Sequence, residues 1–204
     1  MELEKLLSSG RKIRAIGFDD AHCADRTRGA DVNVAGVICS DTRFEGMLWG
    51  TVEKDGFDST SKLAKLLNES KFSAQVQVVI TDGITFGGCN IVDLNLLHQT
   101  TGVPAVAVMR RRPDLEAFRQ VVDKLDDPKR RWGAVEAAGE IHEMLEHVFQ
   151  VVGLEPLVAA RVLRRLTDQG KIPEPIRLAH LIGSAVKLGT SGKRAYPNRN
   201  RITV

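Results

Sequence analysis

Aspartate stands at the end of two apolar runs that are far apart in the chain. Asp82 lies in the stretch ITDGIT, directly after the β-branched run QVQVV, and Asp19 and Asp20 follow the run KIRAIGF. A carboxylate that is buried must be paired, hydrated or bound to a cation. Two carboxylates that lie close together repel one another, and a divalent cation relieves that repulsion. The chemistry that these residues predict is therefore the binding of a divalent metal ion.

Magnesium suits such a site, since it takes oxygen ligands, keeps several waters and often uses only one or two carboxylates. Manganese prefers the same ligands. Asp19 and Asp20 are adjacent, so they point to opposite sides if the strand is regular at that point. We expect one of the two to bind Mg²⁺ or Mn²⁺ together with Asp82. Asp19 is favoured because it directly follows the apolar run.

A third acid would complete the site, and the first candidate is Asp58 in the stretch KDGFDST. The other interpretation of Asp58 is a helix N-cap, because Asp before Ser-Thr is common there. The residues leave both roles open. Further candidates for the third acid are Glu53, Asp55 and Asp93.

The pattern of apolar residues predicts the elements that would bring these acids together. Strands are expected over 12–18, 31–40 and 44–55, joined by short polar links that favour an antiparallel meander. Then follow a helix over 58–70, a strand over 75–83, a helix over 90–102, a strand over 103–110 and a helix over 113–125. The last two strands should be parallel and covered by helices. This order is that of a ribonuclease H-like α/β fold, in which the first and fourth strands lie side by side.

The C-terminal third of the chain gives a weaker pattern. Residues 130–154 have helical periodicity, although HVFQVVGL within them is also compatible with a strand. Helices are expected over 155–171 and 173–192, and His180 is expected to be a packed residue of the second one. We predict a core over 1–138 and a helical C-terminal extension over 139–204 that packs on it and ends in an exposed tail. The sequence does not fix the oligomeric state, and a homodimer with a contact on the C-terminal helices is one alternative.

Composition excludes several classes of protein. The chain has 204 residues, 43% of them hydrophobic, which indicates one domain with a real core. Three cysteines without a CxxC pair argue against a disulfide scaffold and a structural zinc site. The start of the chain lacks the features of a signal peptide, and no apolar run is long enough to cross a bilayer. We expect a protein of the reducing cytoplasm that does not contact a membrane.

Basic and glycine-rich segments indicate where phosphates would bind. The formal charge of +3 is too small to indicate nucleic-acid binding by itself. Arg110, Arg111 and Arg112 form one basic cluster, and others are KRR at 129–131 and the tail KRAYPNRNR. These clusters either contact phosphates or form a solvated surface. The link GITFGGCN could bring backbone N–H groups to a phosphate through Gly83, Gly87 and Gly88.

Several stretches resemble one protein family over nearly the whole chain. They are AIGFDDA, DGFDST, VVITDGITFGGCNIVDL, TGVPAVAVMRR and PEPIRLAHLIGSA. They resemble the endonuclease dU family of mostly archaeal proteins, which is itself similar to endonuclease V. Endonuclease V is a ribonuclease H-like enzyme that nicks nucleic acid near a deaminated base with magnesium.

The resemblance assigns roles to individual residues. It implies that Asp19 and Asp82 bind the metal ion, that Asp58 takes the place of a middle glutamate, and that Arg110 stands where endonuclease V has a lysine. Such a cation would hold the scissile phosphate. The chain departs from endonuclease V where TVEKDGFD replaces the Pro-Tyr-Ile-Pro wedge that opens the duplex.

These observations predict a magnesium-dependent endonuclease with DNA repair as its setting. The nucleic acid would be DNA or RNA, and His22, close after the first-strand acids, is a candidate for a proton carrier. Two alternatives remain: a nucleic-acid-binding module that has lost hydrolysis, and a phosphoesterase for small molecules.

Overall fold

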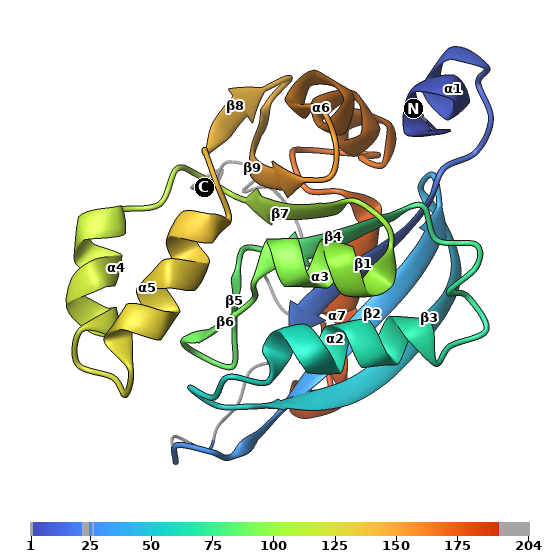
Figure 1. The fold of residues 1–204 in the computed structure, drawn as a ribbon. Helices are drawn as coiled ribbons and strands as arrows, with labels where there is room; N and C mark the ends of the chain where they lie inside the picture. Colours follow the sequence, from blue (N-terminus) through green and yellow to red (C-terminus); the bar gives the residue numbers. More distant parts are fainter. Residues whose placement is uncertain (1, 22–24, 26, 192–204) are drawn as a thin grey trace, which may run out of the picture.

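The protein is an α/β fold built on one seven-stranded sheet with helices on both faces (Figure 1). The computed structural model describes residues 2–21, 25 and 27–191. The sheet has the strand order β3-β2-β1-β4-β7-β9-β8, and β5 and β6 form a separate hairpin. The His22 and Cys23 positions and the basic tail that begins at Lys193 lie outside the described residues.

The first three strands form the antiparallel meander that the sequence predicted. They are β1 (Arg14–Asp20), β2 (Asp31–Ser40) and β3 (Arg43–Glu53). β1 is buried along almost its whole length because it lies in the middle of the sheet. A β-bulge interrupts the pairing of β2 with β3 next to Ile38.

The next strands confirm the ribonuclease H-like order. β4 (Val78–Asp82) pairs in parallel with β1 on one side and with β7 (Ala105–Met109) on the other. The connections are the helices α2 (Ser59–Asn68) and α3 (Leu94–Thr101), which pack on the same face of the sheet. The core under them includes Phe18, Leu63 and Leu97, all fully buried. Between β4 and α3 the chain forms the hairpin of β5 (Thr85–Phe86) and β6 (Asn90–Ile91).

The opposite face is covered by the two ends of the chain. α1 (Glu2–Ser8), α6 (Pro156–Arg165) and the start of α7 (Glu174–Leu188) bury Leu6, Leu163 and Ile176 against this face. α7 runs behind the sheet in Figure 1 and packs on β1 and β2. It approaches β1 closely at Gly17, where a Cβ atom would lie 2.5 Å from the backbone of Pro175.

The region after residue 138 corrects the expectation of an all-helical extension. β8 (His142–Met144) and β9 (His147–Val152) are strands of the main sheet, and β9 pairs antiparallel with β7. The strand interpretation of HVFQVVGL is therefore the right one. The remaining helices, α4 (Leu115–Val122) and α5 (Pro128–Ala137), pack on each other at one end of the sheet (Figure 1).

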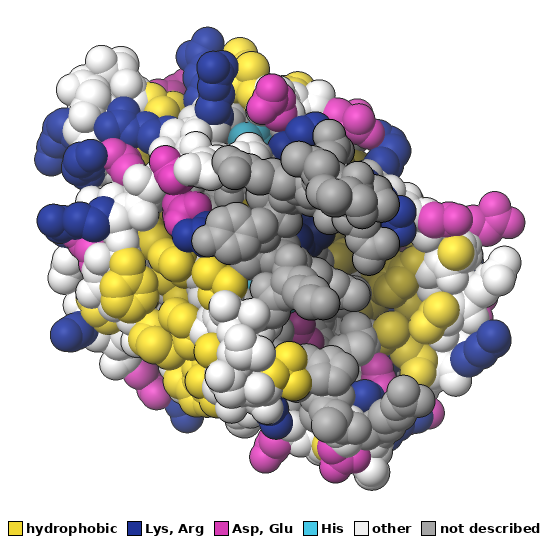
Figure 2. All heavy atoms as spheres, turned by 180° about the vertical axis from the view of Figure 1, so that it is seen from behind, with side chains coloured by type: hydrophobic (Ala, Val, Ile, Leu, Met, Phe, Trp, Pro, Cys, Tyr) yellow, Lys and Arg dark blue, Asp and Glu magenta, His cyan; other side chains and the backbone are white. Residues whose placement is uncertain are grey.

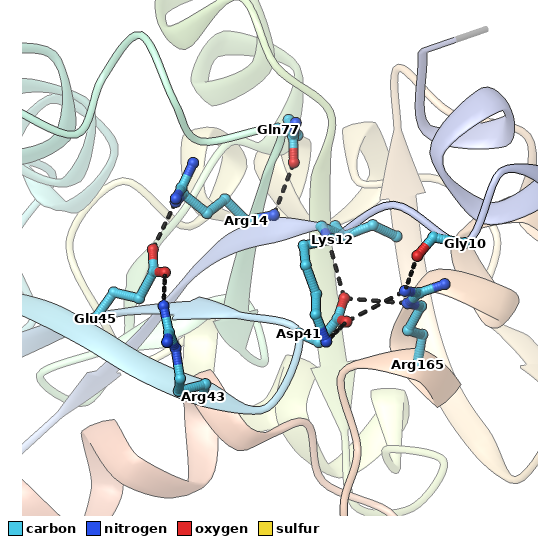
Figure 3. Close-up of polar contacts among 9 residues, drawn as sticks. Gly10, Lys12, Arg14, Asp41, Arg43, Glu45, Gln77 and Arg165 are labelled. Atoms are coloured by element: carbon cyan, nitrogen blue, oxygen red, sulfur yellow. Dashed lines mark hydrogen bonds and ion pairs between the residues drawn. The ribbon is translucent and has the colours of Figure 1, made fainter.

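Ion pairs fasten the end of the sheet that lies opposite the acidic edge. Asp41, in the turn between β2 and β3, accepts hydrogen bonds from Arg165 and from the backbone N–H of Ile13, and pairs with Lys12 (Figure 3). Glu45 pairs with Arg14 of β1 in the same region. These contacts hold α6 and the β2–β3 turn at the start of β1.

The rear face of the molecule combines apolar and charged side chains. Seen from behind, hydrophobic side chains reach the surface between clusters of Lys and Arg (Figure 2). Large apolar side chains that remain exposed include Phe44 and Met47 on β3 and Val186 on α7.

Candidate metal and phosphate site

Asp19 and Asp82 stand next to each other at the ends of β1 and β4. The last pair of the parallel register joins Phe18 to Thr81, and the next residue of each strand is an aspartate. Ala15 and Ile80 of these strands belong to the core beneath α7. Because side chains alternate along a strand, Asp19 and Asp82 lie on that same face. Adjacent strands are about 4.8 Å apart, so the two carboxylates are neighbours at this edge of the sheet.

A polar cavity of about 360 Å³ opens at this edge of the sheet. Its walls are formed by the residues Asp19, Asp20, Ala21, Val32, Lys54, Asp82, Gly87, Gly88, Arg110 and His180. It therefore brings together acids from two strands, the glycine-rich loop and three basic side chains.

His180 of α7 is the direct partner of Asp19. Its Nδ1 lies 2.8 Å from Asp19 Oδ2, and the Asp19 residue is only 5% exposed. The hydrogen bond to Asp19 raises the pKa of His180 above its usual value, although burial works against it. A protonated His180 therefore offsets the negative charge of the cavity and fixes the orientation of Asp19.

Asp20 points to the other side of β1, as the alternation predicts. Its Oδ2 accepts a hydrogen bond of 2.7 Å from the backbone N–H of Gly87. Burial, and then the charge of the neighbouring Asp19, raise the pKa of Asp20 to about 6. The N–H of Gly87 is thus used within the protein to hold the glycine-rich loop on β1.

Asp82 is a partly buried carboxylate that lies close to the charge of Asp19. Burial and the charge of Asp19 raise the pKa of Asp82 to about 6, while Arg110 acts in the opposite direction. The Nη2 of Arg110 lies 3.7 Å from Asp82 Oδ2. Because one half-exposed arginine at this distance does not neutralise the acids fully, a further cation would stabilise their charged forms.

The donor set fits a hydrated magnesium or manganese ion rather than a metal enclosed by protein. Among residues 2–21, 25 and 27–191, no three His, Cys, Asp or Glu side chains converge to enclose a metal ion. Two carboxylates and water are nevertheless a sufficient ligand set for Mg²⁺. Asp19 and Asp82, which lie side by side at this edge and line the same cavity, are the two carboxylates that would hold such an ion.

Asp58, the expected third acid, does not line this cavity. Its Oδ1 accepts hydrogen bonds from the backbone N–H of Glu53 and from Asn90 Nδ2, at 3.0 and 2.7 Å. Asp58 occupies the N-cap position of α2, but its side chain makes no cap hydrogen bond. Asp93 does cap its helix, α3, by accepting from the N–H of Leu96.

The expected phosphate-binding residues divide between two cavities. Gly87, Gly88 and Arg110 line the acidic cavity, whereas Gly83 and Arg112 line a larger one beside it. Arg112 also pairs with Glu143, at 3.2 Å. Arg111 is exposed and lines neither cavity.

The larger cavity is apolar and has a volume of about 690 Å³. It lies between the end of the sheet and the helix pair α4 and α5, and its lining includes Ile84, Met109, Phe118 and Trp132. The chain passes from one cavity to the other between Asp82 and Gly83. Phe86, in the glycine-rich loop, is buried in the core and lines neither cavity.

Sequence reasoning missed His180 and Lys54. A signal for His180 was present, since it lies four residues after the apolar Ile176 and thus on the same face of a helix. Ile176 is fully buried against the sheet, so that face of α7 points toward β1. Lys54 directly follows the end of β3 and carries no comparable signal.

The strand order and the paired aspartates define an α/β protein with the endonuclease V fold, which is ribonuclease H-like. A model of the endonuclease dU family matches residues 11–187, and the chain belongs to that family. A UPF0215 protein of Methanothermobacter thermautotrophicus is 39% identical over 184 residues, which is 88% of this chain and 90% of the relative. Another from Archaeoglobus fulgidus is 36% identical over 189 residues, covering 91% and 99%.

Solved structures show the same fold. The crystal structure of a protein of unknown function from Archaeoglobus fulgidus superposes with a TM-score of 0.81 at 36% identity, covering 86% of this chain and 98% of the other. Human endonuclease V gives a TM-score of 0.54 at 16% identity, covering 89% and 86%. Endonuclease V of Ciona intestinalis, solved with DNA containing an inosine, gives 0.53 at 14% identity, covering 87% and 91%. Among the described residues, no helix is long and apolar enough to span a membrane.

Proposed function

We propose that this protein is a metal-dependent endonuclease that hydrolyses phosphodiester bonds of DNA or RNA at the edge formed by β1 and β4. The observation that carries the proposal is the placement of Asp19 and Asp82 on one face of adjacent strand ends, in a cavity that also holds Arg110. Membership of the endonuclease dU family supports the same reaction class. The free thiols of Cys39 and Cys89 agree with a reducing cytoplasm.

The side chains that line the acidic cavity have different roles in this proposal. Asp19 and Asp82 would hold Mg²⁺ or Mn²⁺, which when bound polarises the phosphate and lowers the pKa of a coordinated water. His180 keeps Asp19 in place through its Nδ1. Arg110 and Lys54 bind the phosphoryl oxygens, and Arg110 balances the charge that develops on them. The products would carry a 3′-hydroxyl and a 5′-phosphate.

The apolar cavity supports a preference for an altered base. A nucleotide whose phosphate lies at Asp82 would have its base within reach of the cavity that begins at Gly83. Trp132 and Phe118 offer apolar surface to a base that has left the stack. A deaminated base leaves the duplex more readily because its pairing is weaker.

A second function is favoured by the position of Asp58. Because this acid is engaged by Glu53 and Asn90 outside the cavity, the site has fewer carboxylates than the family pattern implies. A nucleic-acid-binding module without hydrolysis would need only the basic side chains that line the acidic cavity, such as Lys54 and Arg110.

The test is a nicking assay with labelled oligonucleotides that contain uracil, hypoxanthine or no altered base, with Mg²⁺ or with a chelator. We expect metal-dependent nicking that Asp19→Asn and Asp82→Asn each abolish. Asp168→Asn is the matched control, since Asp168 is exposed and lies outside both cavities. Salt-dependent binding without nicking by the wild type would establish the binding module instead. Hydrolysis of small phosphodiesters alone would point to a phosphoesterase.

A further inference from the structure

Arg131 of α5 is a buried cation, only 2% exposed. Among the described residues it forms no ion pair with a carboxylate. Its guanidinium donates instead to four backbone carbonyls: Nε to Asp126, Nη1 to Gly56 and Cys89, and Nη2 to Asp55. Burying a charged group without a counter-ion is costly unless its hydrogen bonds are satisfied. The four carbonyls satisfy the buried guanidinium, so the guanidinium and the carbonyls hold one another in place.

Three of these carbonyls, those of Asp55, Gly56 and Cys89, belong to two loops that form one wall of the acidic cavity. The first loop follows β3 and contains Lys54, Asp55 and Gly56. The second is the glycine-rich loop that contains Gly87 and Cys89. Lys54 and Gly87 line the cavity, while Arg131 contacts the other side of the same loops.

Other contacts join the two loops directly. The N–H of Asp55 donates to the carbonyl of Gly87 at 2.9 Å, and Asp55 Oδ1 accepts from the N–H of Cys89 at 2.9 Å. Asp55 adopts a positive φ of 53°, a conformation that is uncommon for residues other than glycine. The Phe57 ring lies under Arg131, with its centroid 4.0 Å from Cζ.

We propose that Arg131 is a positioning residue that locks these two loops together and thereby holds Lys54 and the Gly87 N–H in place at the acidic cavity. This rests on the proposed function only for its effect on catalysis. The guanidinium is needed because its fork reaches three carbonyls from two loops with Nη1 and Nη2. Arg131 thus acts through the loops, without touching a reacting atom.

The experiment compares Arg131→Met and Arg131→Lys with Arg130→Met. Arg130 is the control because it also lies over Phe57, at 4.3 Å, but is exposed and donates to none of these carbonyls. Amide hydrogen exchange is measured in the full chain without metal or substrate. We expect the amides of Gly87 and Cys89 to exchange about tenfold faster or more in Arg131→Met, with β1 and β4 unchanged.

Arg131→Lys should show the same effect in weaker form, because a single nitrogen replaces the fork of Nη1 and Nη2 that spans both loops. It decides the question if Arg131→Met does not fold. Wild-type exchange at Gly87 and Cys89 in a folded variant overturns the proposal, and so does a uniform increase over the whole sheet. These readouts do not depend on nuclease activity. If the nicking assay detects activity, kcat/KM should fall about tenfold or more, since the loops no longer hold Lys54 against the phosphate.

Discussion

His180 and Asp19, which are separated by 161 positions in the chain, meet at a distance of 2.8 Å between Nδ1 and Oδ2. The contact joins the C-terminal helix α7 to the first strand of the sheet. It places a group with a raised pKa beside a buried carboxylate, at the edge where Asp82 also ends its strand. The acidic cavity is therefore completed by a helix that lies far from Asp19 in sequence.

The strength of this contact can be measured with a double-mutant cycle of Asp19→Asn and His180→Gln. We expect a coupling of about 1–3 kcal/mol near pH 6, typical of a hydrogen bond between charged groups. Since the folded-state pKa of His180 is raised, its contribution is fully present below the unfolded-state pKa and is lost as pH rises through the folded-state pKa. Urea unfolding at about pH 6 and pH 9 checks this. Equal coupling at both pH values would contradict the proposed protonation.

Asp82→Asn should stabilise the protein in the presence of a chelator. Burial and the charge of Asp19 raise the pKa of Asp82 from 3.8 to about 6, so the folded state binds a proton more tightly than the unfolded state. Wild-type stability should then fall as pH rises through this interval, by up to about 3 kcal/mol. The variant removes that loss, and the exposed Arg110 loses little from it.

Manganese supplies the control for the same pair of proteins. Added Mn²⁺ should raise the thermal midpoint of the wild type and have a smaller effect on Asp82→Asn, because the variant keeps only one of the two carboxylate ligands. A variant that is less stable than the wild type in chelator at neutral pH is the outcome that opposes the prediction.

Asp41→Asn should destabilise the protein at neutral pH by about 1–3 kcal/mol. Although burial works to raise the pKa of Asp41, hydrogen bonds from Arg165, Ile13 and Lys12 lower it below its usual value. The stabilisation is present above the unfolded-state pKa and is lost as pH falls through the folded-state pKa. Urea unfolding at about pH 7 and about pH 3 should therefore show a difference that shrinks in acid.

Glu143→Gln is the comparison for Asp41→Asn. Its pair with Arg112 is exposed on both sides, so its loss should change stability by less than about 1 kcal/mol at either pH. If both variants gave the same small effect, the ion pairs of Asp41 in Figure 3 would contribute no more to stability than an exposed surface pair.

Gly17→Ala should separate α7 from the sheet. A Cβ at this position would lie 2.5 Å from the carbonyl carbon of Pro175 and 2.6 Å from the nitrogen of Ile176, and backbone cannot yield as a flexible side chain does. We expect a loss of about 1–3 kcal/mol. His180 would also move away from Asp19, which a weaker Asp19–His180 coupling would reveal.

Gly133→Ala is the matched substitution on α5. A Cβ at Gly133 meets no atom within 4 Å, and alanine has the higher helix propensity, so this variant should be more stable by about 0.5–1 kcal/mol. Thermal unfolding of both variants tests the pair. A tolerated Gly17→Ala would show that α7 does not approach β1 as closely as the structure indicates.

The sequence alone was sufficient for the strands that carry Asp19 and Asp82. Three antiparallel strands followed by helix, strand, helix and strand indicated a ribonuclease H-like order, which places the first and fourth strands side by side, as the sheet does. The alternation of side chains then separated Asp19 from Asp20, and the hydrogen bonds to His180 and Gly87 confirm that the two point to opposite sides.

Tertiary structure decided what depends on contacts between distant segments. Short apolar runs such as HVFQVV have no period that distinguishes strand from helix, and β9 became a strand because β7 offered a free edge to pair with. The role of Asp58 was also decided by tertiary structure. Its partner Asn90 lies 32 residues away, and no local pattern specifies that hydrogen bond.

The sequence therefore determined which acids stand at the ends of which strands, because burial and periodicity are local properties of the chain. Only the tertiary structure determined that His180 holds Asp19 and that Arg131 reaches the loops behind Gly87. How α7 and α5 dock on the sheet decides which partners these two side chains meet, and docking is a property of the packed molecule.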